Sequence, residues 1–175
     1  GFDHQMPRPE VPGPDRLRYE NDLRAEWVAT MPEEYADWAS SAHPIEVRPV
    51  DPMNIFAPEK RPPHQLCWMR ARNKLPDDQR LHQCVLAYLS DWSLLDTALL
   101  PHAVSYTDGN LQTASLDHAM WFHRPFRADE WLLYVQDSPS ASGARGLNRG
   151  LIYNSAGILV ASAAQEGLMR LHEDD

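Results

Sequence analysis

Gln165 is a lone amide where the surrounding pattern calls for apolar side chains. Residues 159–171 alternate, and the row that contains Gln165 otherwise holds only Leu, Ala, Gly and Met. Such a row is typical of the buried face of a β-strand. Gly167 belongs to the same row, and glycine in a strand often lets a ligand or another backbone approach closely. The pattern alone fits a functional amide and a Gln bonded to neighbouring backbone equally well.

Asp91 is the second candidate, at the edge of the apolar stripe of an expected helix. A carboxylate at such an edge is ordinary when it faces solvent, and the pattern alone favours that explanation. Ser90 and Ser93 beside it are poor helix formers, which weakly indicates a need for small polar groups. Ser115 lies on the polar face of an expected strand, where a solvent-facing row explains it.

Metal binding and several hydrolase classes lack support in the sequence. His118, His123 and Asp117 are metal-ligating types, but residues five apart on a strand point to opposite faces. The chain has no G-x-S-x-G elbow, no H-E-x-x-H pair and no Walker-type glycine loop. Serine hydrolases, zincins and nucleoside triphosphatases therefore lack their signals, and we expect neither a metal nor a cofactor.

The elements that must position these residues are a proline-rich start and a set of strands around one helix. Residues 1–16 are expected to be extended, and residues 17–39 to form one or two short helices. Apolar residues three or four apart predict a largely buried helix over 76–99; they are Leu81, Val85, Leu89, Trp92 and Leu95.

The strands are expected before and after that helix. A hairpin turn is expected at 154–157, where Gly157 tolerates a positive φ. This order is α+β and predicts a curved antiparallel sheet wrapped around one helix. The expected strands are 45–50, 64–72, 111–123, 130–138, 144–154 and 158–171.

Length and composition limit the classes of protein and partner. A chain of 175 residues is about one domain long. The formal charge of −9 would repel nucleic-acid phosphates, and no apolar run approaches the ~20 residues that span a bilayer. We expect Cys67 and Cys84 to be two buried thiols in a reducing cytoplasm rather than one disulfide. Because the chain lacks an initiating Met and a targeting signal, we expect a cytoplasmic fragment or trimmed chain.

Five separated blocks closely resemble the acyl-CoA thioesterase II family of TesB type. The resemblance implies a hotdog fold, an antiparallel sheet wrapped around one long central helix, and it makes this chain the C-terminal half of a double hotdog. Residues 1–42 would be a proline-rich linker with short helices, and residues 43–175 the hotdog thioesterase domain. The blocks are HPIEVRPVD (43–51), LPDDQRLHQCVLAYLSDW (75–92), SLDHAMWFHRPFRADEWLLY (115–134), SASGARGLNRG (140–150) and LVASAAQEGLMR (159–170).

The resemblance also implies a site and a reaction. Family members place an Asp, a Thr and a Gln around the water that attacks a thioester carbonyl. By motif position these are Asp91, Ser115 and Gln165, with Ser115 where the family has Thr. Serine keeps the hydroxyl and loses one methyl, so the role can be retained. The implied activity is hydrolysis of acyl-CoA to free fatty acid and CoA, with Asp91 as base and without a cofactor.

Two other functions stay open. The chain could be a non-catalytic acyl-CoA-binding half that needs its N-terminal partner unit for activity. A hotdog dehydratase would need a His paired with a carboxylate, but His118 and Asp117 occupy opposite faces of a strand. The implied partners are acyl-CoA and an N-terminal hotdog unit or second copy, hence a homo-oligomer.

Two further groups have more than one explanation. Arg145 and Arg149 share a strand face and are candidates for contact with CoA phosphates, although plain surface charge is slightly favoured. Trp121, Phe122 and Trp131 are expected in the core or an interface rather than in an acyl tunnel.

Overall fold

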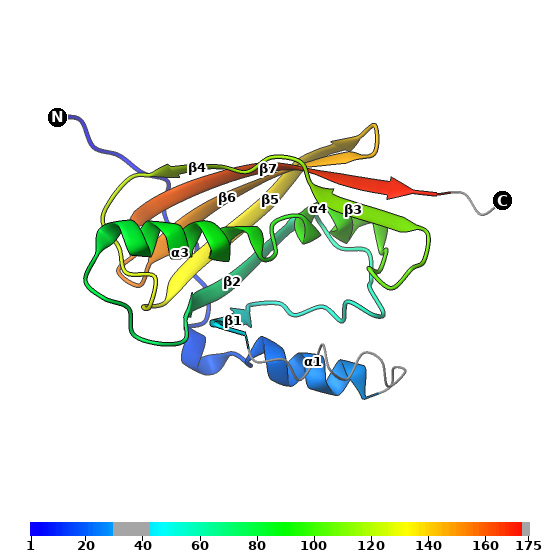
Figure 1. Cartoon of the computed structure of the whole chain (residues 1–175), viewed down its shortest axis with the longest axis horizontal. Coiled ribbons are helices and arrows are strands. Elements are labelled where there is room, and N and C mark those ends of the chain that lie inside the picture. The colour runs from blue at the N-terminus through cyan, green and yellow to red at the C-terminus, as the bar shows by residue number, and fades with distance from the viewer. Residues whose placement is uncertain (30–42, 173–175) are drawn as a thin grey trace.

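Seven strands form one antiparallel sheet in the part of the chain that the structure describes, residues 1–29 and 43–172. The computed structural model has the strand order β1-β2-β5-β6-β7-β3, and β4 also pairs with β7 (Figure 1). The expected α+β class is confirmed. The strands are β1 (Ile45–Pro49), β2 (His64–Ala71), β3 (Leu111–Ser115), β4 (Ala119–Phe122), β5 (Leu132–Ser142), β6 (Arg145–Asn154) and β7 (Leu159–Leu171).

Helix α3 (Gln79–Asp91) packs on one face of the sheet (Figure 1). Asp78 caps its first turn, because the carboxylate accepts a hydrogen bond from the backbone N–H of Arg80 at 3.0 Å. Leu86 and Leu89 are fully buried in the core beneath the helix. This packing fixes where the last residue of α3, Asp91, lies over the sheet.

The expected single helix over 76–99 is wrong, because the helix is interrupted after Asp91. A separate short helix, α4, spans Asp96–Leu99. Between them, the side-chain amide of Gln65 in β2 donates to the backbone carbonyl of Ser93 at 2.8 Å. That carbonyl is thus bonded to the sheet, and a side chain distant in sequence stabilises the break.

The buried face of α3 also differs from the expected stripe. Of the five apolar residues that suggested it, only Leu89 is fully buried. Polar residues share the buried face because they make hydrogen bonds to residues outside the helix. The ring of His82 accepts from the backbone N–H of Ala128 at 3.1 Å, and the hydroxyl of Ser90 lies 2.8 Å from the ring of His118.

The expected strand over 111–123 is two strands, β3 and β4, separated by residues 116–118. The backbone N–H groups of Leu116 and Asp117 both donate to the carbonyl of Glu166, at 3.0 and 3.4 Å. The carboxylate of Asp117 accepts from the backbone N–H of Glu166 at 2.8 Å. Such an irregularity interrupts the alternation of side chains, so face assignments cannot be carried from β3 into β4.

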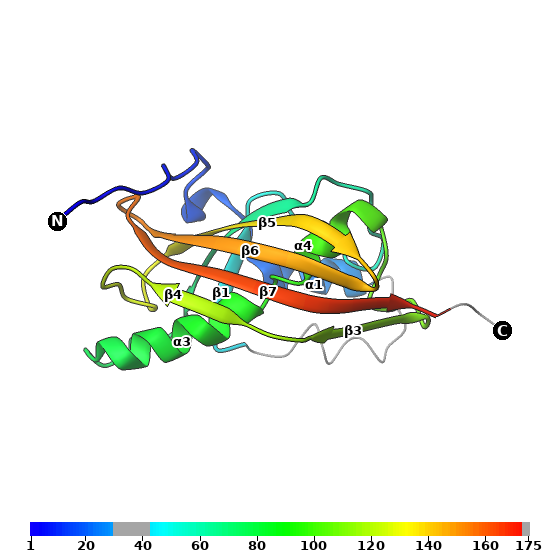
Figure 2. The ribbon, with the colours of Figure 1, turned by 90° about the horizontal axis from the view of Figure 1, so that it is seen from above.

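The first residues run along the face of the sheet opposite α3 (Figure 2). The indole N–H of Trp68 donates to the carbonyl of Pro12 at 2.9 Å. Gln5 bonds to the β6–β7 turn and to β7, donating to Gly157 and accepting from Leu159, at 2.8 and 3.0 Å. The proline-rich start therefore covers an apolar sheet face that would otherwise meet water.

One 3-10 turn, η1 (Pro14–Arg16), interrupts this extended segment. Helix α1 (Glu20–Val28) follows, as the helical prediction over 17–39 requires, and residues 30–42 lie outside the described part. None of the helices in that part is long and apolar enough to cross a membrane. The expected turn at 154–157 is confirmed, with Gly157 at φ +81°.

The two cysteines have different environments. Both are free thiols. Cys67 on β2 is buried in the main hydrophobic core, whereas Cys84 on α3 is exposed. The expectation of two buried thiols is therefore wrong for Cys84. The apolar spacing around Cys84 did not reveal that its side of the helix faces outward.

The three aromatic residues also separate. Trp121 and Phe122 lie on β4 with 53% and 40% of their surface exposed, so they do not belong to the core of this chain. Trp131 packs against the smaller apolar cluster around Trp68, and the guanidinium of Arg70 lies 4.3 Å from its ring centre.

Candidate active site

Asp91, Ser115 and Gln165 meet at the end of α3. The carboxylate oxygen Oδ1 of Asp91 accepts hydrogen bonds from Nε2 of Gln165 and from the hydroxyl of Ser115, the latter at 3.3 Å. The three residues come from α3, β3 and β7. The Asp91 side chain is half exposed, whereas Gln165 is fully buried. The site is thus a carboxylate that faces solvent on one side and two protein donors on the other.

The break between β3 and β4 lies beside Gln165. Ser115 pairs with Gly167 and Ala119 pairs with Ala164, so neither strand pairs with Gln165 itself. The irregular backbone brings Ser115 and His118 to the two sides of this position. Bulges of this kind commonly re-aim side chains next to active sites.

His118 and Ser90 form a second layer behind the carboxylate. Nδ1 of His118 lies 3.9 Å from Oδ1 of Asp91, and its Nε2 lies 2.8 Å from the hydroxyl of Ser90. The backbone carbonyl of Ser90 accepts from the hydroxyl of Tyr134 at 3.0 Å. The pattern of small polar groups near Asp91 was the only sequence signal for Ser90. For His118 the sequence suggested only the roles of a metal ligand or a dehydratase residue.

Asn148 is a residue that sequence reasoning missed. It lies directly opposite Gln165 in the β6–β7 register, and both side chains are fully buried. Within the described residues, neither side-chain oxygen has a hydrogen-bond partner. The available signal was a polar residue between Gly146 and Gly150, in the row of β6 that faces the core.

The residues considered for dehydration, metal binding and CoA phosphate contact do not form a comparable cluster in the described part of the chain. Asp117 bonds to the backbone of Glu166 and does not meet His118, as a dehydratase pair would require. Within residues 1–29 and 43–172, no three His, Cys, Asp or Glu side chains are grouped so that they could hold a metal ion. Arg149 is paired with Asp137 at 2.6 Å and Arg145 with Glu166 at 3.7 Å, both at the surface.

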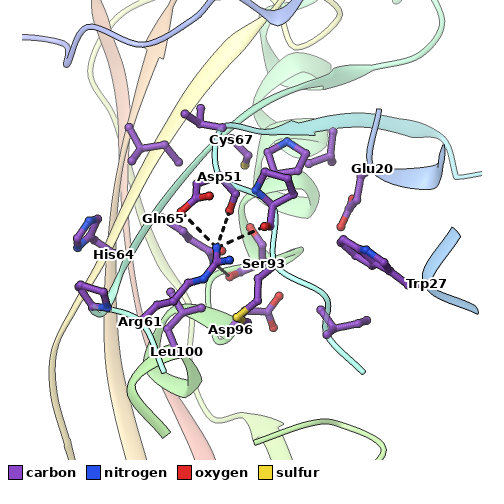
Figure 3. Close-up of a pocket in the computed structure, with 18 residues that line it drawn as sticks. Glu20, Trp27, Asp51, Arg61, His64, Gln65, Cys67, Ser93, Asp96 and Leu100 are labelled. Carbon is purple, nitrogen blue, oxygen red and sulfur yellow. Dashed lines mark hydrogen bonds and ion pairs between the residues drawn. The ribbon is translucent and has the colours of Figure 1, made fainter. Parts of the chain in front are cut away.

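A cavity of about 400 Å³ lies apart from these residues, between α1, β1, β2 and the segment that follows α3 (Figure 3). Ser93 and Asp96 line it, but Asp91, Ser115 and Gln165 do not. Burial raises the pKa of Asp96 to about 6, although a hydrogen bond from Tyr106 acts in the opposite direction. The cavity therefore has its own titratable carboxyl and is not part of the Asp91 cluster.

The cluster around Asp91 can support general base catalysis. In the described part of the chain all its contacts are made to Oδ1, and Oδ2 has no hydrogen-bond partner. An exposed carboxylate oxygen can accept a proton from water, while its fellow oxygen is held by fixed donors. The hydroxyl of Ser115 can also donate to or accept from a bound water.

The chain resembles proteins of known family in sequence. A family model described as acyl-CoA thioesterase matches residues 36–168. Acyl-CoA thioesterase 2 of Haemophilus influenzae is 37% identical over 173 residues, which are 99% of this chain and 60% of that protein. Acyl-coenzyme A thioesterase 8 of Homo sapiens is 39% identical over 175 residues, covering 96% of this chain and 54% of that protein.

Solved structures agree. The crystal structure of an acyl-CoA thioesterase II, TesB2, from Mycobacterium marinum is 43% identical with a TM-score of 0.74, covering 99% of this chain and 59% of that one. A hot dog fold protein from Alicyclobacillus acidocaldarius has a TM-score of 0.68 at 18% identity, covering 99% and 58%, which shows the fold alone.

The expected hotdog fold is thereby confirmed. The chain spans 54% to 60% of the length of these relatives. Because the family model matches most of its residues, the chain belongs to the acyl-CoA thioesterase family.

Proposed function

We propose that the protein containing this chain hydrolyses acyl-CoA to a free fatty acid and CoA, with Asp91, Ser115 and Gln165 as its catalytic residues. The observation that carries the proposal is the convergence of Ser115 and Gln165 on one oxygen of Asp91. The relatives from Haemophilus influenzae and Homo sapiens are both named acyl-CoA thioesterases, which supports the same thioester hydrolysis.

Asp91 acts as the general base in this proposal. Its free oxygen, Oδ2, takes a proton from water as the water oxygen attacks the thioester carbonyl. The bond between carbonyl carbon and sulfur then breaks, and the proton held by Asp91 neutralises the departing CoA thiolate. Ser115 and Gln165 orient the carboxylate and the water, and no covalent acyl-enzyme forms.

We also propose how the chain is divided and which unit it pairs with. Residues 43–175 form the hotdog thioesterase unit, and residues 1–42 form the linker that leads into it. The outer edges of β3 and β4 have no neighbouring strand within the described residues, and exposed Trp121 and Phe122 lie on β4. Unpaired strand edges with apolar side chains favour pairing with another unit. That unit is an N-terminal hotdog of the same protein or a second copy of this chain. We place the protein in the cytoplasm.

A second candidate is a half that binds acyl-CoA but is inactive without its partner unit. The half-exposed side chain of Asp91 favours it, because a site open to bulk water gives up part of its electrostatic stabilisation of the transition state. In that case the partner closes the site.

The test is release of CoA from a medium- or long-chain acyl-CoA, followed with a thiol reagent. The whole encoded protein should release CoA, and Asp91→Asn should reduce kcat at least about a hundredfold, because the base is lost. Asp137→Asn is the matched control, since this carboxylate pairs with Arg149 at the surface. Unchanged kcat in Asp91→Asn would exclude Asp91 as base.

The same assay on the 175-residue chain separates the two candidates. Activity of the isolated chain, with circular dichroism showing that it is folded, supports a complete catalytic unit. A folded chain that binds acyl-CoA without hydrolysing it supports the half that needs its partner.

A further inference from the structure

We propose that His118 is a positioning residue for Asp91, holding its carboxylate through an N–H donated from Nδ1. The inference rests on the proposed function, because it assigns His118 a part in orienting the base. It concerns a side chain outside the three residues proposed above.

The geometry places the imidazole between a buried hydroxyl and the carboxylate. Nε2 of His118 is 2.8 Å from the hydroxyl of fully buried Ser90, and Nδ1 is 3.9 Å from Oδ1 of Asp91. Nδ1 is shielded from solvent and has no hydrogen-bond partner within the described residues. Only a modest shift of the carboxylate would complete a hydrogen bond, and such contacts commonly tighten when substrate binds.

The proposal requires one particular tautomer of His118, with the proton on Nδ1 and the hydroxyl of Ser90 donating to Nε2. That hydroxyl has one hydrogen and three possible acceptors: Nε2 of His118 at 2.8 Å, the carbonyl of Ala87 at 3.0 Å and the sulfur of Met120 at 3.2 Å. The proposal assigns the hydrogen to the shortest of these contacts. When the hydroxyl donates to Nε2, the neutral ring must carry its proton on Nδ1, facing Asp91. The opposite tautomer would aim a lone pair at the carboxylate in a place that water cannot reach, which is unfavourable.

Ser90 is itself held from both sides. Its carbonyl accepts from Tyr134 in the centre of the sheet, so the residue preceding Asp91 cannot drift. The chain of contacts from Tyr134 through Ser90 and His118 therefore reaches Oδ1 of Asp91. A third donor on Oδ1, beside Ser115 and Gln165, leaves Oδ2 as the oxygen that receives the proton.

Two substitutions separate the two nitrogens of the ring. The amide of Asn reaches the place of Nδ1, and the amide of Gln reaches that of Nε2. His118→Gln therefore keeps the contact with Ser90 but loses the donor to Asp91, whereas His118→Asn keeps the donor. We expect His118→Gln to lower kcat about tenfold with KM changed less than about twofold, and His118→Asn to stay within about threefold of wild type.

His123→Gln is the matched control. The ring of His123 lies 2.8 Å from the hydroxyl of Ser162, the same kind of His–Ser pair at the same distance, but without contact to Asp91. We expect kcat and KM of this variant to match those of wild type. Equal loss of kcat in His118→Gln and His118→Asn, in proportion to a lowered melting temperature, would show a merely structural role and overturn the proposal.

A second measurement does not depend on activity. Long-range ¹H–¹⁵N NMR correlations of the whole protein distinguish the two tautomers, and His118→Gln identifies the signal. Protonation at Nδ1 supports the proposal, and protonation at Nε2 alone overturns it. A wild-type protein with the Nδ1–H tautomer but no release of CoA would contradict the proposed function instead.

Discussion

The side-chain amide of Gln165 donates a hydrogen bond to the carboxylate of Asp91, although 74 residues separate them in the chain. One residue ends a helix and the other lies in the middle of a strand. Neither would be distinctive alone: an exposed carboxylate at a helix end and an amide in a strand both have ordinary explanations. Their direct contact converts two weak candidates into one chemically defined group.

The hydroxyl of Ser115 should matter more than its missing methyl. We predict that Ser115→Ala lowers kcat for acyl-CoA about ten- to a hundredfold, because a donor to Asp91 and to the water is lost. Ser115→Thr restores the hydroxyl and should stay within a few-fold of wild type. Ser155→Ala, in the exposed β6–β7 turn, is the control. Wild-type kcat in Ser115→Ala would exclude the hydroxyl from the reaction.

Gly150 supports the site through a close approach to Tyr134. A Cβ at Gly150 would lie 2.1 Å from Cε2 of the fully buried Tyr134 ring. Gly150→Ala should lower the free energy of unfolding, measured with urea, by about 1–3 kcal/mol through overpacking. Because Tyr134 bonds the carbonyl of Ser90, kcat should fall as well. Gly109→Ala, with no atom within 4 Å of the added Cβ, should leave both unchanged.

Asp96 should make the fold less stable as the pH rises. Burial raises its pKa in the folded state to about 6, from 3.8 in the unfolded chain. Between those values the folded state binds more protons than the unfolded state, so the stability contribution is present below about pH 4 and is lost as the pH rises through 6. Asp96→Asn removes the charge and should raise stability at pH 7.5 by up to about 3 kcal/mol, a gain that vanishes below pH 4.

Thermal melting of wild type and Asp96→Asn across pH 4 to 8 measures that difference. Asp22→Asn, on the solvent side of α1, is the matched control substitution. A constant difference between wild type and Asp96→Asn over the whole range would show that Asp96 does not titrate there.

The two thiols should react at very different rates. Cys84 is exposed, whereas Cys67 is buried and its pKa is raised to about 12 by burial. We predict that a thiol reagent labels Cys84 in the native protein and Cys67 only after unfolding. Peptide mass spectrometry assigns each label, and Cys84→Ser should remove the native one. Fast native labelling of Cys67 would contradict its burial.

Local patterns were sufficient for most strands and for the hairpin turn. Alternation predicted β1 and a short apolar run predicted β2, each within one residue of its ends, and Gly157 marked the turn between β6 and β7. These features depend on neighbouring residues only. Patterns failed where a residue distant in sequence forms a hydrogen bond. Gln65 donates to the carbonyl of Ser93 inside the expected long helix. The carbonyl of Glu166 accepts from two backbone N–H groups where the expected strand over 111–123 is interrupted.

The sequence by itself determined the class of fold and, through five blocks of family resemblance, a hypothesis of three site residues. Only the tertiary structure decided that Asp91 ends its helix beside Gln165, and that Ser90, His118 and Asn148 surround them. The physical reason is the sequence distance over which the two kinds of interaction act. Periodicity reports which side of one element is apolar, whereas a site consists of hydrogen bonds between elements, whose geometry follows from packing the whole chain.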